Sequence, residues 1–364
     1  MSLDSLPATS GDRRPEGDPR TNLFGLDREA IADALGPLAP RPFVAGQVYR
    51  WMYGRRMHDF AGMTDLPSAL RSAHEERFRI AWPRVREVRV SGEDGSKKYV
   101  LGLDDGREVE AVYILYGTRV TLCLSSQAGC ALKCRFCLTG TMGLQRHLTP
   151  GEILGQVAVL ARDNDLAPNG YRIVFMGMGE PLHNYDAVLA AFRVLADADG
   201  FGLAPRRVTL STVGLVPAID RLARESPRPR LAISLAAGHD ALRDDLMPIN
   251  RTYRLERLME ACRRFPLAAR ERITFEYILI EGVNDAPEEA RRVARLLRGV
   301  RAKVNVIPYN EAGFEGFRTP SPAAVTGFRD ALLDRGIPAS VRWSKGRDIG
   351  AACGQLVRRP AAAS

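Results

Sequence analysis

The stretch GCALKCRFC, from Gly129 to Cys137, carries Cys130, Cys134 and Cys137 within eight residues. The C-x3-C-x2-C spacing brings three thiolates around one inorganic centre on a short loop. A [4Fe–4S] cluster normally takes four cysteine ligands, so three leave one iron open. Zinc is the alternative because sulfur ligands suit it as well. Structural zinc sites usually have paired C-x2-C units or a spaced histidine. Only His147 lies nearby, so the spacing favours the cluster.

Length and composition limit the class of protein. The chain has 364 residues, of which 45% are hydrophobic, enough for a sizeable core in one large domain or in two to three modules. No apolar stretch approaches 18 residues, so we expect no membrane partner. Residues 1–22 lack the apolar core of a signal peptide, and we expect a disordered tail on a cytoplasmic protein. The net charge of +9 favours a polyanionic partner.

The first part of the chain changes from a helical to a strand pattern. In residues 23–84, apolar side chains recur every three or four residues, which predicts a helical accessory domain. In residues 85–119, period-two runs separated by Gly/Asp turns predict a small β-extension. Its strand candidates are Val85 to Val90, Lys98 to Leu101 and Val109 to Leu115.

Residues 120–345 alternate strand and helix patterns, and residues 346–364 form a closing segment. Six such repeats predict an α/β fold with a parallel sheet, open or curled into a partial (β/α)6 barrel. The strand candidates are Val120–Ser125, Tyr171–Met176, Val208–Thr212, Leu231–Leu235, Ile273–Ile280 and Val304–Pro308. Helical patterns between them include Pro150–Arg162, Asp186–Ala196, Leu255–Phe265 and Glu288–Leu297. The cysteine loop begins just after the first strand, at the end where barrel active sites lie.

A glycine-rich run, GMGEP, follows the second strand from Gly177 to Pro181. Its glycines allow a backbone to approach a ligand closely. The carboxylate of Glu180 can accept a hydrogen bond from an ammonium group. Taken alone, the run is equally consistent with a simple turn.

Three cysteines lie outside the cysteine loop. Cys262 shares one helical stripe with apolar residues, so we expect it in the core. Cys123 lies on the first strand, at the end where the cysteine loop begins. Cys353 lies in a closing segment of small residues without apolar periodicity. It is consistent either with a small buried residue or with a reactive thiol.

Together these motifs resemble the RlmN/Cfr family of radical S-adenosylmethionine (SAM) RNA adenosine methyltransferases. The cysteine spacing, with Phe136 before the last cysteine, is that of the radical SAM superfamily. The runs TLCLSSQAGC (residues 121–130), GMGEP and AACGQL (residues 351–356) are similar to those of the family, and the resemblance covers about Phe43 to Leu356. It implies a [4Fe–4S] cluster, held by the three cysteines of the loop, whose open iron chelates SAM. It also implies two SAM molecules per turnover.

The resemblance also implies roles for individual residues. Cys353 matches the cysteine that becomes S-methylated, Cys123 its resolving partner in a transient disulfide, and Glu110 the proposed base. Period two places Glu110 on the face of Val112 and Ile114, where burial would perturb its pKa. The expected SAM contacts are Gly179, Glu180, Ser211, Ser234, Leu235, Ala236 and Asn310. The family usually has a histidine where this chain has Ala236, so here the backbone would make the SAM contact in place of a side chain.

The implied activity is methylation of C2 of an adenosine in the peptidyl-transferase region of 23S rRNA and of one in the tRNA anticodon loop. The helical accessory domain would bind RNA, and a flavodoxin or ferredoxin would donate electrons. Three alternatives remain open: C8 methylation as in the Cfr branch, an Fe–S electron carrier or redox sensor, and a zinc-bearing RNA-binding module without catalysis.

Overall fold

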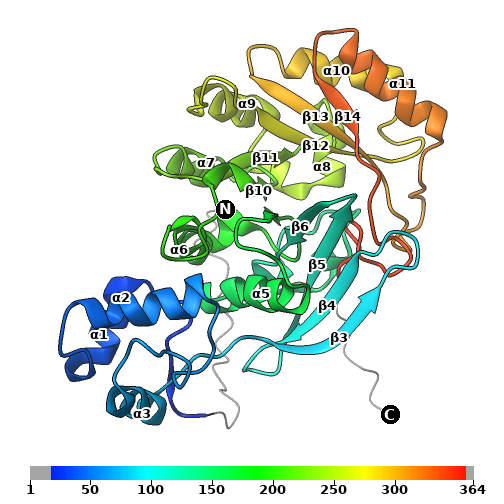
Figure 1. Cartoon of the computed structure of the whole chain (residues 1–364). Helices are drawn as coiled ribbons and strands as arrows, with labels where there is room; N and C mark the ends of the chain where they lie inside the picture. The colour runs from blue at the N-terminus through cyan, green and yellow to red at the C-terminus, as the bar shows by residue number, and fades with distance from the viewer. Residues whose placement is uncertain (1–17, 358–364) are drawn as a thin grey trace.

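The computed structural model describes residues 18–357, and its core is a mixed ten-stranded sheet (Figure 1). In spatial order the strands are β14 (Ala339–Val341), β13 (Ala302–Pro308), β12 (Ile273–Leu279), β11 (Arg230–Ser234), β10 (Val208–Thr212), β9 (Tyr171–Phe175), β6 (Arg119–Cys123), β5 (Glu108–Tyr116), β4 (Lys97–Gly102) and β3 (Arg84–Val90). The strands from β14 to β6 are parallel, and β5, β4 and β3 are antiparallel.

The predicted α/β fold is confirmed, with two differences in the sheet. A seventh parallel strand, β14, lies at one edge; at three residues it is too short to show a pattern in the sequence. The β-extension joins the same sheet, because β5 pairs directly with β6. The sheet therefore stays open, and the barrel is partial.

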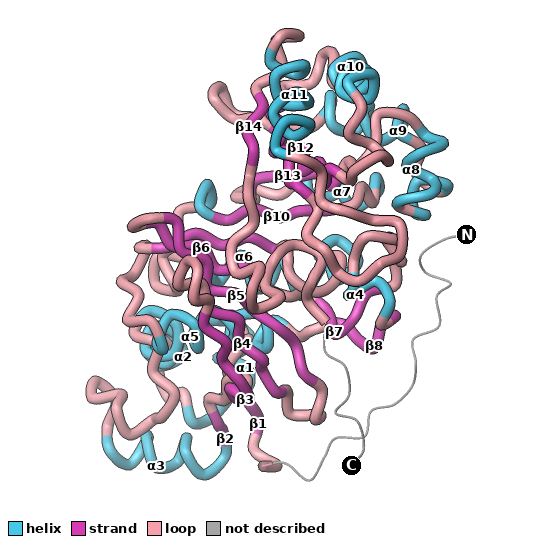
Figure 2. The backbone as a smooth tube through the Cα atoms, turned by 90° about the vertical axis from the view of Figure 1, so that its right-hand side faces the viewer, coloured by secondary structure: helices cyan, strands magenta, loops and turns pink. Residues whose placement is uncertain are grey.

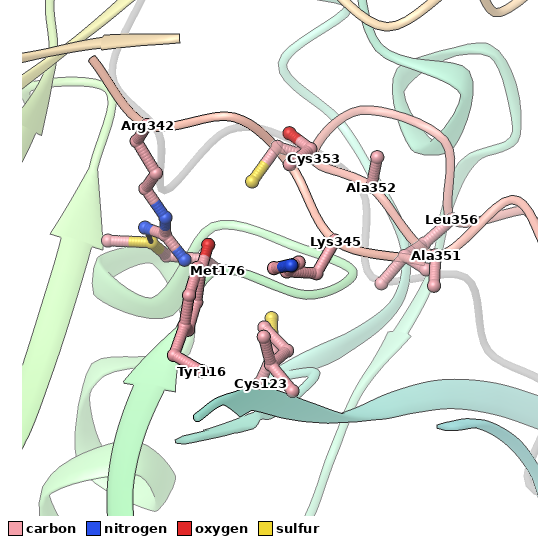
Figure 3. Close-up of a pocket in the computed structure, with 11 residues that line it drawn as sticks. Tyr116, Cys123, Met176, Arg342, Lys345, Ala351, Ala352, Cys353 and Leu356 are labelled. Carbon is pink, nitrogen blue, oxygen red and sulfur yellow. Dashed lines mark hydrogen bonds between the residues drawn. The ribbon is translucent and has the colours of Figure 1, made fainter. Parts of the chain in front are cut away.

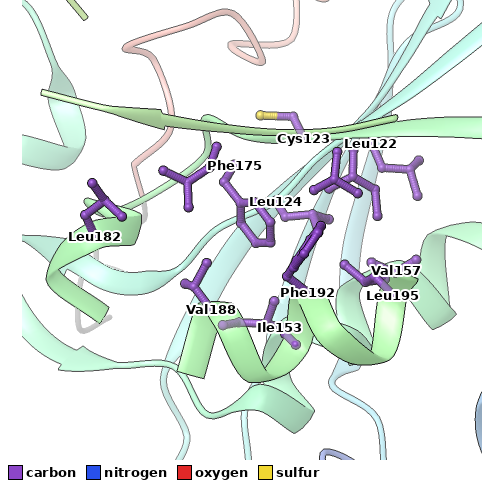
Figure 4. Close-up of a cluster of buried hydrophobic side chains, with 14 of the residues drawn as sticks. Leu122, Cys123, Leu124, Ile153, Val157, Phe175, Leu182, Val188, Phe192 and Leu195 are labelled. Carbon is purple, nitrogen blue, oxygen red and sulfur yellow. The ribbon is translucent and has the colours of Figure 1, made fainter. Parts of the chain in front are cut away.

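Helices cover one face of the parallel strands. They are α5 (Pro150–Asp163), α6 (Tyr185–Ala196), α7 (Val216–Leu222), α9 (Leu255–Arg264), α10 (Pro287–Leu296) and α11 (Pro322–Leu333). Leu122 and Leu124 point into the apolar layer between sheet and helices, whereas Cys123 points to the opposite face (Figure 4). This alternation follows from the period of two along a strand. The face without these helices is therefore where strand side chains are available for chemistry.

The accessory region is helical, as predicted, with α1 (Arg28–Leu35), α2 (Phe43–Tyr49) and α3 (Ser68–Arg77). It packs on the barrel through polar contacts such as Arg28 Nη2 to Asp199 Oδ2 at 2.7 Å. The predicted tail covers residues 1–22, of which 1–17 lie outside the described residues. Thr21–Asn22 instead form a short strand, β1, that pairs with β2 (Phe78–Arg79).

A short hairpin, β7 (Gln127–Cys130) with β8 (Gly143–His147), follows β6, and the helix α4 (Leu138–Thr141) lies between its strands in sequence (Figure 2). The sequence patterns missed this hairpin. Gly129 is required in it, because its φ is +76° and a Cβ there would lie 1.9 Å from the Gly143 carbonyl oxygen. None of the helices in the described residues is long and apolar enough to cross a membrane.

Candidate active site

The cysteine loop runs from the end of β7 to the start of α4. Cys130 ends the strand, Cys134 lies on the turn, and Cys137 is the residue before the helix. The amide of Cys137 donates to the Cys134 carbonyl at 3.1 Å, which tightens the loop. Burial and the neighbouring thiols raise the pKa of Cys134 well above its usual range, and burial raises that of Cys130 to about 12. Such thiols bind as thiolates only where a cation compensates their charge.

These thiols fit an iron–sulfur cluster. Within residues 18–357, no three His, Cys, Asp or Glu side chains converge closely enough to hold a single metal ion. A cubane cluster does not require that, because each thiolate binds a different iron. Three half-buried cysteines from one loop are the soft donor set that such a cluster takes.

A buried guanidinium that the sequence did not reveal holds the neighbouring loops. Arg243, on α8 (Asp240–Leu246), is fully buried. It donates to the carbonyls of Val213, Leu235 and Ser234 at 2.6, 3.0 and 3.1 Å, so it joins the chain after β10 to the end of β11. In sequence it lies beside Asp244 and Asp245, a context typical of an exposed ion pair.

The GMGEP run lies directly after β9, beside the cysteine loop. The amide of Glu180 donates to Gln127 Oε1 at 2.8 Å, and a Cβ on Gly179 would lie 2.5 Å from the Gln127 Cβ, so only glycine fits. The Glu180 carboxylate is 2% exposed and accepts from the amides of Leu182 and Val213 at 3.0 and 2.9 Å. Burial outweighs these bonds and raises the pKa of Glu180 to about 7.

The other predicted SAM contacts lie where neighbouring strands end. Ser211 is on β10, Ser234 ends β11, and Asn310 follows β13; Leu235 and Ala236 continue from Ser234. Parallel strands bring these positions to the same edge as the cysteine loop. Ala236 is buried with φ +60°, and its carbonyl accepts from Asn284 Nδ2 at 2.8 Å, so the backbone here is held in the left-handed conformation.

Cys123 and Cys353 line one pocket, although they are far apart in sequence. Figure 3 shows both sulfur atoms pointing into it, with the head group of Arg342 alongside. Its volume is about 20 Å³, room for about one water molecule. Burial raises the pKa of both thiols, that of Cys123 to about 12, and Arg342 opposes the rise at each.

The segment that carries Cys353 is docked on the cysteine loop. The Leu138 amide donates to the Gly354 carbonyl at 2.8 Å, and Thr139 Oγ1 donates to the Leu356 carbonyl at 2.6 Å. Lys98, from the β-extension, donates to the Gly350 carbonyl at 3.2 Å. The closing segment is thus clamped between the cysteine loop and β4.

Glu110 lies beside this pocket on β5 and is 2% exposed, on the buried face with Val112 as expected. One carboxylate oxygen pairs with Lys98 Nζ at 3.2 Å, and the other accepts from the Val357 amide at 3.0 Å. Burial raises the pKa of Glu110 despite the opposing effect of Lys98. Strand periodicity alone could have indicated Lys98, because it lies on the same strand face as Val100, the residue opposite Glu110.

The disulfide between Cys123 and Cys353, predicted as a transient species, is not present in this structure. All six cysteines are free thiols. Cys262 is 1% exposed on α9 and belongs to the core, as predicted.

The sheet and the three-cysteine loop define a radical SAM protein, and residues 124–296 match the model of the radical SAM superfamily. Residues 21–80 match the ribosomal RNA large subunit methyltransferase N-terminal domain. The chain belongs to the RlmN family of radical SAM RNA methyltransferases.

Its relatives match almost from end to end. The dual-specificity RNA methyltransferase RlmN of Syntrophotalea carbinolica is 47% identical over 93% of this chain and 90% of its own. The RlmN of Anaeromyxobacter dehalogenans is 48% identical over 93% of this chain and 92% of its own. The crystal structure of a radical SAM methyltransferase from Sphaerobacter thermophilus has a TM-score of 0.87 and 42% identity, covering 92% of this chain and 99% of that one.

Proposed function

We propose that this enzyme methylates C2 of an adenosine in 23S rRNA and of an adenosine in tRNA, with Cys353 as the methyl carrier. The observation that carries the proposal is the shared pocket of Cys123 and Cys353, directly against the cysteine loop. Membership of a dual-specificity RNA methyltransferase family supports the two substrates. C2 of adenine is electron-poor and cannot attack a methyl sulfonium, so a radical route is needed.

Cys130, Cys134 and Cys137 would hold the [4Fe–4S] cluster, and Glu180 with the strand-end residues would bind SAM. When bound, the cluster supplies the electron that cleaves SAM to methionine and the hydrogen-abstracting 5′-deoxyadenosyl radical. Side chains of the protein then carry out the remaining steps at the adenine. Arg342, beside both thiols, favours the thiolate that each must become to react.

Cys353 would first take a methyl group from one SAM as a thiolate, which releases S-adenosylhomocysteine. Loss of a hydrogen atom from that methyl group gives an S-methylene radical that bonds to C2. The adduct would then lose one electron, for which the oxidised [4Fe–4S] cluster would be the acceptor, and Glu110 would take the C2 proton. The Cys123 thiolate then attacks the Cys353 sulfur, the carbon–sulfur bond breaks, and the carbon gains a proton. The transient disulfide must afterwards be reduced.

The pocket must open for this series of steps, because a volume of about 20 Å³ cannot admit an adenine. Movement of the Cys353 segment would also withdraw the Val357 amide from Glu110. The base would therefore become free at the step at which the substrate enters. We propose that a flavodoxin or ferredoxin supplies the electrons, and that ribosomal and transfer RNA substrates place the reaction in the cytoplasm.

Mass-spectrometric mapping of the methyl group on RNA modified by the reconstituted enzyme tests the proposal. We expect 2-methyladenosine in both rRNA and tRNA fragments, and none with Cys353→Ala. A product methylated at C8 would instead assign the chain to the Cfr-like activity. No methylation by an enzyme that still cleaves SAM would contradict the proposal.

A further inference from the structure

A second cavity lies on the face of the sheet that the helices leave uncovered. Along β9, Tyr171, Ile173 and Phe175 are buried in the core, whereas Arg172 and Val174 alternate with them and line this cavity. The same alternation brings side chains from six parallel strands into one concavity of about 330 Å³. It is large enough for a phosphate group with its ribose.

The lining of this cavity is strongly cationic. It holds eight Arg or Lys side chains and a single acidic one, Glu271. Glu271 is within 3.8 Å of Arg228, which is outside the lining. Six of the eight cations form no hydrogen bond or ion pair with another described residue, although most arginines on the helical face do. They are Arg172, Arg206, Arg230, Arg270, Arg272 and Lys303.

Grouping unpaired like charges is unfavourable in the protein alone. Burial lowers the pKa of Lys303, the Glu276 carboxylate opposes this effect, and the charges of Arg230, Arg172 and Arg272 lower the pKa further. An anionic ligand would remove this repulsion. Concentrated cations without carboxylate partners are typical of a surface that binds phosphates.

The cavity is at the opposite end of the barrel from the cysteine loop. Arg230 is the first residue of β11, and Arg272 immediately precedes β12, whereas the cysteine loop lies at the carboxyl ends of the strands. Arg342 and Tyr116 line both this cavity and the Cys123–Cys353 pocket, so the two adjoin. The cavity therefore extends from the cations at the amino ends of the strands to Arg342 and Tyr116, which border the cysteine pocket.

We propose that this cavity binds the phosphates of the substrate RNA next to the target adenosine, which then enters the cysteine pocket past Arg342 and Tyr116. The inference rests on the proposed function, since it takes RNA as the substrate. Base-modifying enzymes extrude the target base from its stack, and phosphate contacts hold the flanking backbone in position. An acidic electron-donor protein is the other polyanion available, but it must dock near the cluster, at the opposite end.

Removing two of the unpaired cations tests the proposal. The variant Arg172→Gln/Arg230→Gln changes exposed side chains without partners, so the fold should persist. The matched control, Arg224→Gln/Arg298→Gln, removes two exposed and unpaired arginines beside the helical layer, after α7 and α10. The ligand is an RNA hairpin with an adenosine in its loop, and its dissociation constant is measured from 50 to 300 mM KCl.

We expect the cavity variant to bind the hairpin at least about fivefold more weakly, with the slope of log K against log salt reduced by about 1.4, or 0.7 for each lost contact. The control should bind like the wild type. Unchanged affinity and slope in the cavity variant would overturn the proposal, as would an equal loss in the control. Slower reduction by flavodoxin with RNA binding intact would also overturn it, because the cavity would then bind the donor.

Failure of the proposed function has a separate signature. Transfer of a methyl group from SAM to Cys353 needs no RNA, so both double variants should retain it in the reconstituted full-length enzyme. If the wild type itself does not methylate Cys353, the proposed function fails, and the binding comparison still tests whether the cavity holds RNA.

Discussion

The Leu138 amide donates a hydrogen bond of 2.8 Å to the carbonyl of Gly354, one residue from each of Cys137 and Cys353. The segment with Cys353, the proposed methyl carrier, is thereby fixed directly to the loop of the proposed cluster ligands. Thr139 adds the second bond, to the carbonyl of Leu356. These two hydrogen bonds hold Cys353 beside the cysteine loop, and they must break when the pocket opens.

Thr139→Val should loosen this docking. It removes the donor to Leu356 and leaves a buried carbonyl without a partner, at a cost of about 1–3 kcal/mol. Hydrogen exchange of residues 346–357 should become faster, while the sheet stays protected. Thr141→Val is the matched control, since that hydroxyl bonds within α4 to the Leu138 carbonyl. Equal exchange in both variants would show that the Thr139 bond does not hold the segment.

Replacing any one of Cys130, Cys134 or Cys137 with Ala should abolish the iron–sulfur absorbance and SAM cleavage. Two thiolates cannot hold a cluster that already lacks a fourth protein ligand. Cys262→Ala should keep both properties, because that thiol is packed in the core. Metal analysis after anaerobic reconstitution checks the outcome. Full deoxyadenosine production by a loop variant, or stoichiometric zinc in the wild type, would contradict the cluster assignment.

SAM affinity should depend on pH through Glu180. Burial raises the pKa of this carboxyl from 4.5 to about 7, and only the ionised form attracts the SAM ammonium group. Affinity should therefore fall as the pH decreases below 7, by up to about tenfold per pH unit. Calorimetric titration from pH 6 to 8 should show this loss of affinity for the wild type. The control Glu311→Gln, at an exposed residue near the same strand ends, should behave like the wild type. Glu180→Gln should bind weakly and without pH dependence; a wild-type slope in that variant would exclude Glu180 as the titrating group.

Lys98→Met should separate methyl transfer to Cys353 from the methylation of RNA. Without the ammonium group, the buried Glu110 carboxylate loses its partner, which costs about 3 kcal/mol of unfolding free energy when it stays charged. Protonation of Glu110 relieves that cost and removes the base. We expect RNA methylation to fall at least tenfold while methyl transfer to Cys353 continues. Lys98→Met/Glu110→Gln should recover the stability but not the activity. If methylation of RNA is unchanged in Lys98→Met, Glu110 is not the base.

Much of the site was predictable because its residues follow strand ends at regular intervals. Cys123, Ser211 and Ser234 lie on strands whose apolar patterns are clear, and parallel strands bring their carboxyl ends together. Arg243 was not predictable, because its partners are carbonyls, which any sequence supplies. The docking of Cys353 was likewise hidden, since its contacts are hydrogen bonds to backbone carbonyls between segments more than 200 residues apart. The β7–β8 hairpin was missed because its strands are short and polar.

The central claim is that Cys353 carries the methyl group and Cys123 releases the product, and trapping the adduct tests it most directly. Cys123→Ala, with its cluster reconstituted and with SAM and substrate RNA present, should accumulate a covalent protein–RNA species. Digestion and mass spectrometry should locate the crosslink at Cys353, and omission of SAM or loss of the cluster should abolish it. Cys353→Ala should give neither crosslink nor methylated protein. Normal turnover by Cys123→Ala, or a crosslink at Cys262, would contradict the account.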